Sequence, residues 1–319
     1  ATMDDRLTPS QWGFLQIRDM PTREELQQHY AERYFQNPQS SSYRSSYSED
    51  EIEYTESRAD LKRFAAEAHL TSDRPWRLLD VGCGEGWLLS VFHRAGWDVT
   101  GIDFSSFGIS RHNPELVEDV IIGDVYELLD GLASDSQVFD VVNLDHVLEH
   151  VIDPVGLLAR LHTVLRPGGV LVIDVPNDGN EFHEELFADS RIECRWWIAP
   201  PEHLNYFTPD SFNQAALVAG WDVLDMFADF PIDWYLANRG SNYVDDSSRG
   251  PEAHSARLLL SRHIRARGQN RELEFYRSLA AVGLGRSITG VLATAHPNGD
   301  VRGSATQLCV GGYASRSQS

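Results

Sequence analysis

The fold of this chain is decided by the stretch Arg77–Asp103, RLLDVGCGEGWLLSVFHRAGWDVTGID. Its short apolar run, Leu78–Val81, is typical of a buried strand. Three glycines alternate with other residues directly after that run, and a helical pattern follows over Trp87–Arg94. A second strand over Asp98–Ile102 then leads to an acid, Asp103. The stretch therefore predicts a strand, a glycine turn, a helix and a second strand with a carboxylate at its tip.

This arrangement is suited to a ligand that carries a ribose. Gly82, Gly84 and Gly86 allow the backbone to turn tightly and to approach a ligand where a Cβ would collide. The helix that follows directs free N–H groups at the same place. Asp103 comes 21 residues after Gly82 (103 − 82), close to the roughly 20 expected of an acid that accepts both ribose hydroxyls.

The glycine spacing indicates which ribose ligand to expect. It is G-x-G-x-G preceded by Asp80, whereas a dinucleotide fingerprint is G-x-G-x-x-G. The segment DVGCGEG resembles the first motif of the class I S-adenosylmethionine-dependent methyltransferases. The resemblance implies S-adenosylmethionine as methyl donor and S-adenosylhomocysteine as product; a glycine turn that binds nothing is the less favoured alternative. The donor-binding residues that we expect are Asp80, Gly82, Cys83, Gly84, Gly86, Asp103, Phe104, Asp124, Val125, Leu144 and Asp145.

Length and composition are those of an ordinary globular protein. The 319 residues are 42% hydrophobic and 24% charged, enough for one large domain with additions. The three cysteines, Cys83, Cys194 and Cys309, are scattered, which argues against a disulfide framework or a cysteine zinc site and fits a reducing cytoplasm. We see no membrane-spanning run and no signal-peptide pattern, so we expect a cytoplasmic protein that does not bind membranes.

The net charge of −21 disfavours a nucleic-acid partner, because an acidic surface repels phosphate backbones. A local basic groove is still compatible with it. Lys62 is the only lysine, while arginine is common. The composition of a GC-rich genome and adaptation to high salt are two explanations that the sequence leaves open.

The part of the chain before residue 74 has no clear strand. A helix is expected from Pro21 to about Phe35, and a second one over Glu51–His69. Between them, Asn37–Asp50 is rich in Ser and Tyr and is typical of a loop. It is either a linker or a lid with Tyr43 or Tyr47 reaching the cofactor or substrate; the resemblance favours a helical cap with a lid.

Further methyltransferase resemblances follow the first motif. Val120–Asp124 is a short third strand, and by resemblance Asp124 would contact the adenine amino group while Val125 and Phe104 pack on the ring. The alternative for Asp124 is a helix N-cap. The fourth strand, Phe139–Leu144, leads into HVLEHVIDP, and LRPGG precedes the fifth. Both phrases resemble methyltransferases, and HVLEHVIDP is similar to the matching stretch of ubiquinone-biosynthesis O-methyltransferases and of many sugar and natural-product methyltransferases.

His146, Glu149 and His150 also spell H-x-x-E-H, the inverted zinc-protease signature. On a helix the three side chains would share one face. A zinc hydrolase is nonetheless disfavoured, since the motif follows a strand of a parallel sheet beside a cofactor site. Ubiquinone enzymes can hold Mg²⁺ on this face, but with Glu at the first position. His146 disfavours such an oxygen-loving ion, so Mg²⁺ is possible but not favoured and we assign no residue as a metal ligand.

The catalytic residues that we expect are histidines with a carboxylate. His146 or His150 would act as general base, and Glu149 would hold an imidazole in its tautomer. The alternative is that Glu149 and His150 only brace the loop. A later phrase, EHLNYFT, again resembles natural-product methyltransferases and makes His203 a second candidate base.

Aromatic residues are the candidates for the acceptor site. Trp197, Tyr206, Trp196 and Phe207 could form an apolar substrate wall, although at least two of them are expected in the core. The substrate-binding residues that we expect are Tyr47, Trp197, Tyr206 and Tyr235.

The chain beyond residue 230 departs from a minimal methyltransferase. A helical insertion is expected over residues 231–300, for substrate recognition or homodimer contacts, before a last strand over Thr306–Tyr313. Its arginines 257, 262, 265 and 267 could bind an anionic substrate, although a solvated helix face accounts for most of them. The expected division is a helical cap over 1–73, a donor-binding core over 74–230, the insertion, and the last strand with its tail over 301–319.

The sequence therefore predicts an α/β protein with a doubly wound, mostly parallel Rossmann-like sheet. The expected activity is methyl transfer from S-adenosylmethionine to a small molecule, namely a sugar, nucleotide-sugar or secondary metabolite, at oxygen, nitrogen or carbon. The rival hypotheses are a nicotinamide-dependent oxidoreductase, the zinc hydrolase, and a protein that binds the cofactor without catalysis.

Overall fold

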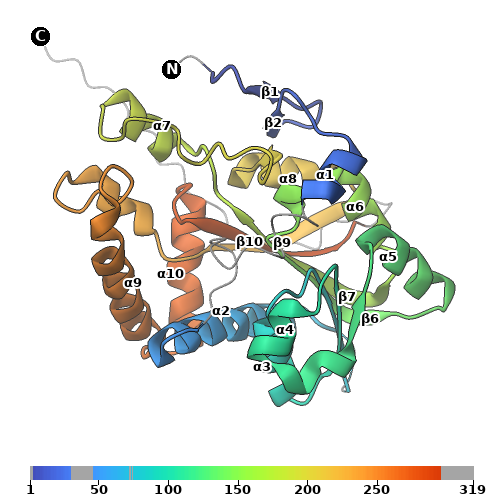
Figure 1. The fold of residues 1–319 in the computed structure, drawn as a ribbon. Coiled ribbons are helices and arrows are strands. Elements are labelled where there is room, and N and C mark those ends of the chain that lie inside the picture. Colours follow the sequence, from blue (N-terminus) through green and yellow to red (C-terminus); the bar gives the residue numbers. More distant parts are fainter. Residues whose placement is uncertain (1–2, 30–45, 72, 74, 296–319) are drawn as a thin grey trace, which may run out of the picture.

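A computed structural model of the chain describes residues 3–29, 46–71, 73 and 75–295. Within them lies a seven-stranded sheet in the order β5-β4-β3-β6-β7-β10-β9 (Figure 1). The first five strands in this order are parallel, and β10 runs antiparallel to both β7 and β9. The strands are β3 (Arg77–Val81), β4 (Asp98–Asp103), β5 (Val120–Ile122), β6 (Phe139–Asp145), β7 (Leu165–Pro176), β9 (Trp221–Ala228) and β10 (Ser287–Thr294).

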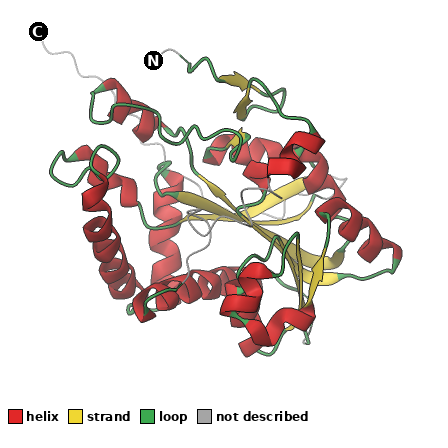
Figure 2. Ribbon diagram, in the orientation of Figure 1, coloured by secondary structure: helices red, strands yellow, loops and turns green. Residues whose placement is uncertain are grey.

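Helices cover both faces of this sheet, as Figure 2 shows. The central strands are near-continuous apolar runs because a parallel sheet is buried on both sides. Helices α5 (Val125–Ser134), α6 (Pro154–Leu161) and α8 (Pro209–Val218) pack on one face. Helices α2 (Glu49–Glu67), α3 (Trp87–Arg94), α4 (Phe107–His112) and α10 (Gln269–Ala281) pack on the other. The doubly wound fold expected from the sequence is confirmed.

Strand β10 sets this sheet apart from a dinucleotide-binding one. Gly290 pairs with Ile173 of β7 on one side and with Met226 of β9 on the other, antiparallel to both. The dinucleotide fold orders its parallel strands 3-2-1-4-5-6 without such an insertion. The last strand expected over 306–313 lies outside the described residues. The structure instead places a strand at Ser287–Thr294, inside the range expected as helical insertion, so the helices of that insertion end with α10.

The N-terminal segment is more than a helical cap, which corrects one expectation. Strands β1 (Leu7–Pro9) and β2 (Leu15–Ile17) pair with β8 (Asn205–Tyr206) in a small antiparallel sheet. Strands of two or three residues are too short to show an alternating apolar pattern in the sequence. In addition, β2 pairs with β8, which lies far along the chain. Helix α1 (Arg23–His29) begins where expected, and the expected end of that helix and most of the Ser- and Tyr-rich loop lie outside the described residues.

Helix α2 forms as expected because its first turn is well capped. The Ser48 side chain accepts from the Glu51 N–H, and the Glu51 carboxylate accepts from the Ser48 N–H. Helix α9 (Gly250–Arg265) of the insertion is tied to α2 by ion pairs, with Arg262 bonded to Asp50 and Arg265 to Asp60. These two insertion arginines therefore join helices and do not face a ligand.

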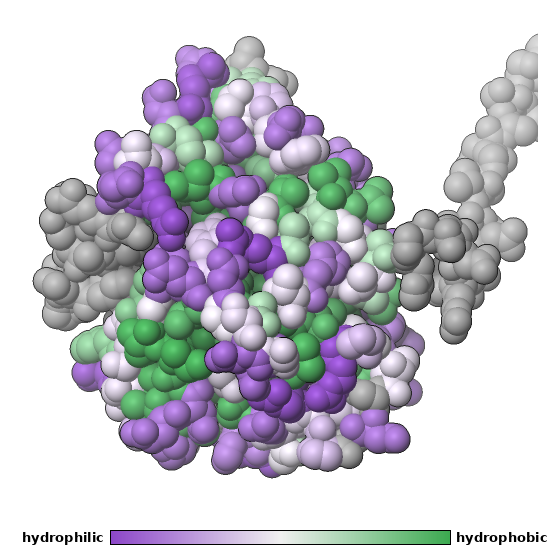
Figure 3. All heavy atoms as spheres, turned by 90° about the vertical axis from the view of Figure 1, so that its right-hand side faces the viewer, coloured by the Kyte–Doolittle hydropathy of each residue, from purple (hydrophilic) through white to green (hydrophobic). Residues whose placement is uncertain are grey.

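The remaining short elements connect the core to its surroundings. They are η2 (Pro114–Asp119), η3 (Leu148–His150), α7 (Glu181–Ala188), η4 (Ile232–Ala237) and η5 (Ser247–Arg249). On the face shown in Figure 3, apolar residues form separate patches among hydrophilic ones. Within the described ranges, no helix combines the length and the apolar character needed to cross a membrane.

Candidate active site

The glycine turn between β3 and α3 requires glycine at two positions in particular. Gly82 and Gly86 have φ of +75° and +78°, a region that other residues rarely adopt. A Cβ on Gly82 would lie 2.6 Å from Val147 Cγ2, and one on Gly86 would lie 2.9 Å from Ile109 Cδ1. The turn therefore lies directly against neighbouring elements, and its backbone faces open space on the remaining side.

That open space is a cavity of about 930 Å³ at the carboxyl ends of β3, β4, β5 and β6, where open α/β sheets bind ligands. Asp103 ends β4, and its carboxylate accepts from the Gly84 and Ser105 N–H groups at 2.9 Å. Burial raises the pKa of Asp103 while these bonds hold it down. Of the expected donor-binding residues, Gly82, Gly84, Asp103, Phe104, Asp124, Val125 and Asp145 line this cavity.

The other expected donor-binding residues lie behind the cavity. Asp80 is buried between β3 and β6, where its Oδ1 accepts from Asn143 Nδ2 at 2.8 Å. Burial raises its pKa to about 7. Cys83 and Leu144 are buried in the core, and Gly86 caps α3. None of these four residues is among the lining residues.

Asp124 serves both purposes considered for it. It is the N-cap of α5, accepting from the N–H groups of Tyr126 and Glu127, and it lines the cavity. Its Oδ2 also accepts from Arg23 Nη2 of α1 at 2.9 Å. The Arg23 guanidinium lies over the Tyr126 ring, 5.7 Å from its centre. Helix α1 thus closes over this end of the cavity.

A second cavity, of about 380 Å³, meets the first at Trp87, Asp145 and His146, which line both. One side of it is a stripe of α2, from which Tyr54, Arg58 and Lys62 project because residues four apart share a helix face. Its other lining residues come from the ends of β6, β7 and β9, from α9 and from the start of β10. They include Asp174, Asp229, Arg257, Arg286 and Ser287.

Lys62 projects from α2 into the second cavity and contacts carboxylates of β6 and β7. Its side chain is 6% exposed, and its Nζ lies 2.5 Å from Asp145 Oδ1 and 2.8 Å from Asp174 Oδ2. Burial alone would lower the pKa of Lys62, but the two carboxylates raise it. Burial likewise opposes ionisation of Asp174, and the Lys62 charge overcomes it and lowers the Asp174 pKa to about 2. The ammonium group is therefore a fixed cation beneath Asp145.

His146 lies at the junction of the cavities. It directly follows β6 with φ of +54°, a strained conformation of the kind found at functional sites. Its Nδ1 lies 3.2 Å from Glu149 Oε1, and its Nε2 lies 3.8 Å from Asp174 Oδ1. Burial would lower the pKa of His146, but its bond to Glu149 and the Asp174 charge raise it to about 9. Half of the side chain is exposed to the cavity, so solvent screens part of this effect.

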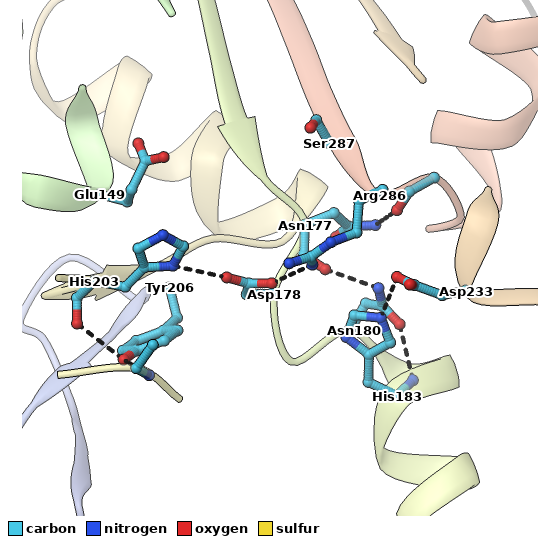
Figure 4. Close-up of polar contacts among 12 residues, drawn as sticks. Glu149, Asn177, Asp178, Asn180, His183, His203, Tyr206, Asp233, Arg286 and Ser287 are labelled. Carbon is cyan, nitrogen blue, oxygen red and sulfur yellow. Dashed lines mark hydrogen bonds and ion pairs between the residues drawn. The ribbon is translucent and has the colours of Figure 1, made fainter. Parts of the chain in front are cut away.

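His150 and His203 lie next to each other on the far side of Glu149. The His150 Nδ1 contacts the Glu202 carbonyl, which leaves Nε2 as the second ring nitrogen, 3.7 Å from Glu149 Oε1. Burial lowers the pKa of His150. The His203 Nδ1 lies 3.1 Å from Asp178, and Figure 4 shows Asp178 between His203 and Arg286. His150 lines the larger cavity, whereas His203 is not among the lining residues of either.

The His146–His150 segment is not the helix on which three ligands would converge. Only Leu148–His150 forms a 3-10 turn, and His146 is turned away from it by its positive φ. A magnesium ion at His146, Glu149 and His150 would meet two imidazoles and one carboxylate, and Mg²⁺ prefers oxygen ligands in octahedral geometry. The residues present do not fit Mg²⁺.

Glu149, His150 and His203 do bring one ligand atom each within 4.8 Å of one another. Within the described residues, the buried Glu149 Oε2 has no hydrogen-bond partner. Two imidazoles and a carboxylate are a donor set suited to Zn²⁺. A second group, Asp145, His146 and Asp174, has similar spacing but already holds the Lys62 ammonium.

The four expected substrate-binding aromatics are not among the lining residues of either cavity. Tyr47 donates to Glu85 of the glycine turn at 3.0 Å. Trp197 is buried and stacks on His183, and Tyr206 is buried with its hydroxyl donating to the His203 carbonyl. Tyr235 packs against the core face that α2 and α10 cover.

Several lining residues were not expected from the sequence. They are Arg23, Arg58, Lys62, Trp87, Tyr126, Arg160, Asp174 and Arg286. The signal that could have found two of them is the spacing of Tyr54, Arg58 and Lys62, which puts two cations on one face of a helix that precedes the first core strand. No comparable spacing in the sequence indicated Arg286 or Asp174.

Comparisons with known proteins agree on one family. A family model described as a methyltransferase domain matches residues 50–225. A ubiquinone biosynthesis O-methyltransferase of Cereibacter sphaeroides is 31% identical over 186 residues, 54% of this chain and 73% of that protein. Its counterpart in Ruegeria pomeroyi is 30% identical over 192 residues, 56% of this chain and 77% of that protein.

Among solved structures, a methyltransferase from Archaeoglobus fulgidus described as SAM dependent has a TM-score of 0.47 at 19% identity, over 76% of this chain and 94% of that one. The residues matched by the family model include most of the lining of both cavities. Arg257 and Arg286 of the smaller cavity lie beyond them.

Proposed function

Because this chain belongs to the methyltransferase family whose model spans residues 50–225, and its methyl donor is S-adenosylmethionine, we propose that it methylates a small-molecule acceptor held where the two cavities meet. The observation that carries this proposal is the position of His146. Its imidazole, bonded to Glu149, lines both cavities at the end of β6.

The donor would bind in the larger cavity. The Asp103 carboxylate is placed to accept the ribose hydroxyls, and Asp124 with the half-exposed Phe104 is placed for the adenine. The glycine turn and the first N–H groups of α3 would face the carboxylate end of the donor. Its methyl group would then point toward the junction with the smaller cavity.

In the proposed reaction the acceptor's lone pair forms a bond to the methyl carbon while the carbon–sulfur bond breaks. The electron pair of that bond goes to sulfur, which leaves as neutral S-adenosylhomocysteine, and the acceptor's proton goes to His146 Nε2. Glu149 would hold the opposite ring nitrogen and stabilise the imidazolium that forms. The protein otherwise contributes alignment of the two reactants.

His146 is favoured over the other two candidate bases by geometry. His150 lines only the donor cavity, and its Nε2 lies beside Glu149. His203 is not among the lining residues of either cavity and is held by Asp178. We propose that these two residues position Glu149, which lies beside both.

The acceptor is proposed to be a sugar, a nucleotide-sugar or a secondary metabolite. The two relatives are O-methyltransferases by name, which supports oxygen as the acceptor atom. A net charge of −21 supports a small molecule over a nucleic acid. The nicotinamide hypothesis is disfavoured by the antiparallel β10 and by the glycine spacing. The zinc-hydrolase hypothesis is disfavoured by the conformation of the His146–His150 segment.

Calorimetric titration with S-adenosylhomocysteine tests the donor site, with NAD as control ligand and a second run in EDTA. We expect micromolar binding of S-adenosylhomocysteine alone, unchanged by EDTA, because the lining residues provide a carboxylate and backbone N–H groups and need no metal. The protein must first be checked to be free of co-purified ligand. Binding of NAD, or binding of neither ligand, would then contradict the proposal. A need for Zn²⁺ in later turnover assays would make Glu149, His150 and His203 metal ligands.

A further inference from the structure

Two arginines of the smaller cavity each keep a buried nitrogen without a hydrogen-bond partner among the described residues. Arg58 of α2 and Arg257 of α9 both line it. In the described part of the chain neither forms an ion pair with a carboxylate, and Arg58 Nη2 and Arg257 Nε are buried without a hydrogen-bond partner. A buried polar group left without a partner destabilises the protein, and a charged one does so more strongly. The cavity therefore presents donors that lack an acceptor.

Both guanidinium groups are held in place by aromatic rings. Arg58 lies over Tyr276, 5.2 Å from the ring centre, and Arg257 lies over Tyr54 at 4.9 Å. Their other contacts are to neutral acceptors: Arg58 Nη1 lies 3.4 Å from the Ala228 carbonyl and Arg257 Nη2 lies 2.6 Å from His254 Nδ1. Stacked guanidinium groups lose little freedom on binding, which suits bidentate recognition of an anion.

The remaining cations of the cavity are already neutralised. Lys62 contacts two carboxylates, and Arg286 Nη1 lies 2.5 Å from Asp178 Oδ1. Asp229 is the remaining lining carboxylate, and its Oδ1 accepts from the backbone N–H groups of Arg286 and Ser287. Burial raises the pKa of Asp229 while the nearby Arg58 charge opposes that rise, and no ion pair joins the two side chains in the described structure. Arg58 and Arg257 are thus the two lining cations that keep a buried N–H donor without a partner among the described residues.

We propose that the smaller cavity is an acceptor subsite in which Arg58 and Arg257 bind a carboxylate or phosphate group of the acceptor. This inference rests on the proposed function and adds the substrate class to it. An anion held there leaves the rest of the acceptor facing His146 and the methyl donor. The volume of about 380 Å³ lies within the range of small-ligand pockets, about 300–1,000 Å³.

The two arginines come from different parts of the chain, which supports an acceptor specificity that is particular to this protein. Arg58 lies within the residues that the family model matches, whereas Arg257 belongs to the insertion beyond them. Helix α9 is fixed against α2 by the pairs of Arg262 with Asp50 and Arg265 with Asp60. The insertion therefore brings a second guanidinium to a cavity that the core alone would leave with one.

The test is calorimetry on protein saturated with S-adenosylhomocysteine, with inorganic phosphate, benzoate and neutral benzamide as probes. We expect at least one anion to bind and benzamide not to bind. Arg58→Gln and Arg257→Gln are each expected to weaken anion binding at least tenfold. The matched control Arg267→Gln, an exposed residue just after α9, is expected to change it less than twofold. None of the three should change S-adenosylhomocysteine affinity by more than twofold.

If phosphate binds more tightly than benzoate, the acceptor's anionic group is a phosphate; if benzoate binds more tightly, it is a carboxylate. The inference is overturned if neither anion binds, if benzamide binds as well as benzoate, or if Arg257→Gln keeps the full affinity. Should Arg58→Gln melt early in a thermal scan, Arg257→Gln and Arg257→Lys decide, with the lysine variant expected to be intermediate because it keeps the charge and loses the fork. Failure of S-adenosylhomocysteine binding would refute the proposed function alone, since the unloaded protein can be titrated with the same anions.

Discussion

At the scale of single residues, His146 is the position with the sharpest consequence for activity. Its carboxylate neighbours raise its pKa to about 9, so most of the imidazole is protonated at neutral pH and only the small neutral fraction can accept a proton. With an acceptor from a screen, we expect kcat/KM to rise about tenfold per pH unit and to level off near pH 9. If His150 were the base, its lowered pKa would give a profile already flat above pH 7.

Two variants sharpen this prediction. His146→Gln should lower kcat about 10²–10⁴-fold with S-adenosylhomocysteine affinity retained, whereas exposed His93→Gln on α3 should match the wild type.

Glu149→Gln removes a carboxylate that raises the His146 pKa, so the rising limb of the pH profile should move to lower pH. NMR titration of the imidazole reads the same pKa without any acceptor.

Lys62 is the residue on which stability should depend most. Lys62→Met leaves Asp174 buried without its counter-charge, and breaking a buried pair in this way costs about 3–5 kcal/mol. Urea unfolding at pH 7 measures this loss in the free energy of unfolding. Arg262→Met, which breaks a half-exposed pair with Asp50, should cost less than about 1 kcal/mol.

The pH dependence of this loss follows from Asp174. Its pKa is lowered to about 2 in the folded protein, so the stability it contributes is present above its unfolded pKa of about 3.9 and is lost as pH falls through 2. Without Lys62 the carboxyl should take up a proton at higher pH and shed its unpaired charge. The cost of Lys62→Met is therefore expected to be smaller at pH 4 than at pH 7; a constant cost would mean that Asp174 is not the group left unpaired.

At the scale of elements, the glycine turn is the part that tolerates least change. Gly82→Ala would place a methyl group 2.6 Å from Val147 Cγ2 in a backbone conformation with φ of +75°. Relieving both requires the turn to move away from the donor cavity, so we expect S-adenosylhomocysteine affinity to fall more than tenfold. Calorimetry measures it, and Gly131→Ala on α5, where no atom lies within 4 Å of the new Cβ, is the matched control.

At the scale of the whole molecule, the site is assembled from segments that are distant in sequence. The donor cavity is built mostly from the consecutive strand ends of β3 to β6, while the smaller cavity adds α2, α9 and the start of β10. Ion pairs between α2 and α9 hold the two sides of that smaller cavity at a fixed separation.

The sequence by itself determined the parallel core, the donor-side turn and the acid Asp103, because these depend on local patterns: apolar runs, glycines and a strand-to-acid spacing. It also identified Glu149 as the carboxylate that would hold the imidazole of His146 or His150. Only the tertiary structure decided which histidine lies at the junction of the cavities, since His146 owes its position to a positive φ and to an N–H bond with the Asp174 carbonyl of β7. Two of the expected aromatics, Trp197 and Tyr206, were drawn into the core because burying a large apolar ring is more favourable than exposing it. The acceptor side stayed hidden because Arg58, Arg257 and Arg286 are brought together by long-range packing, which leaves no local pattern.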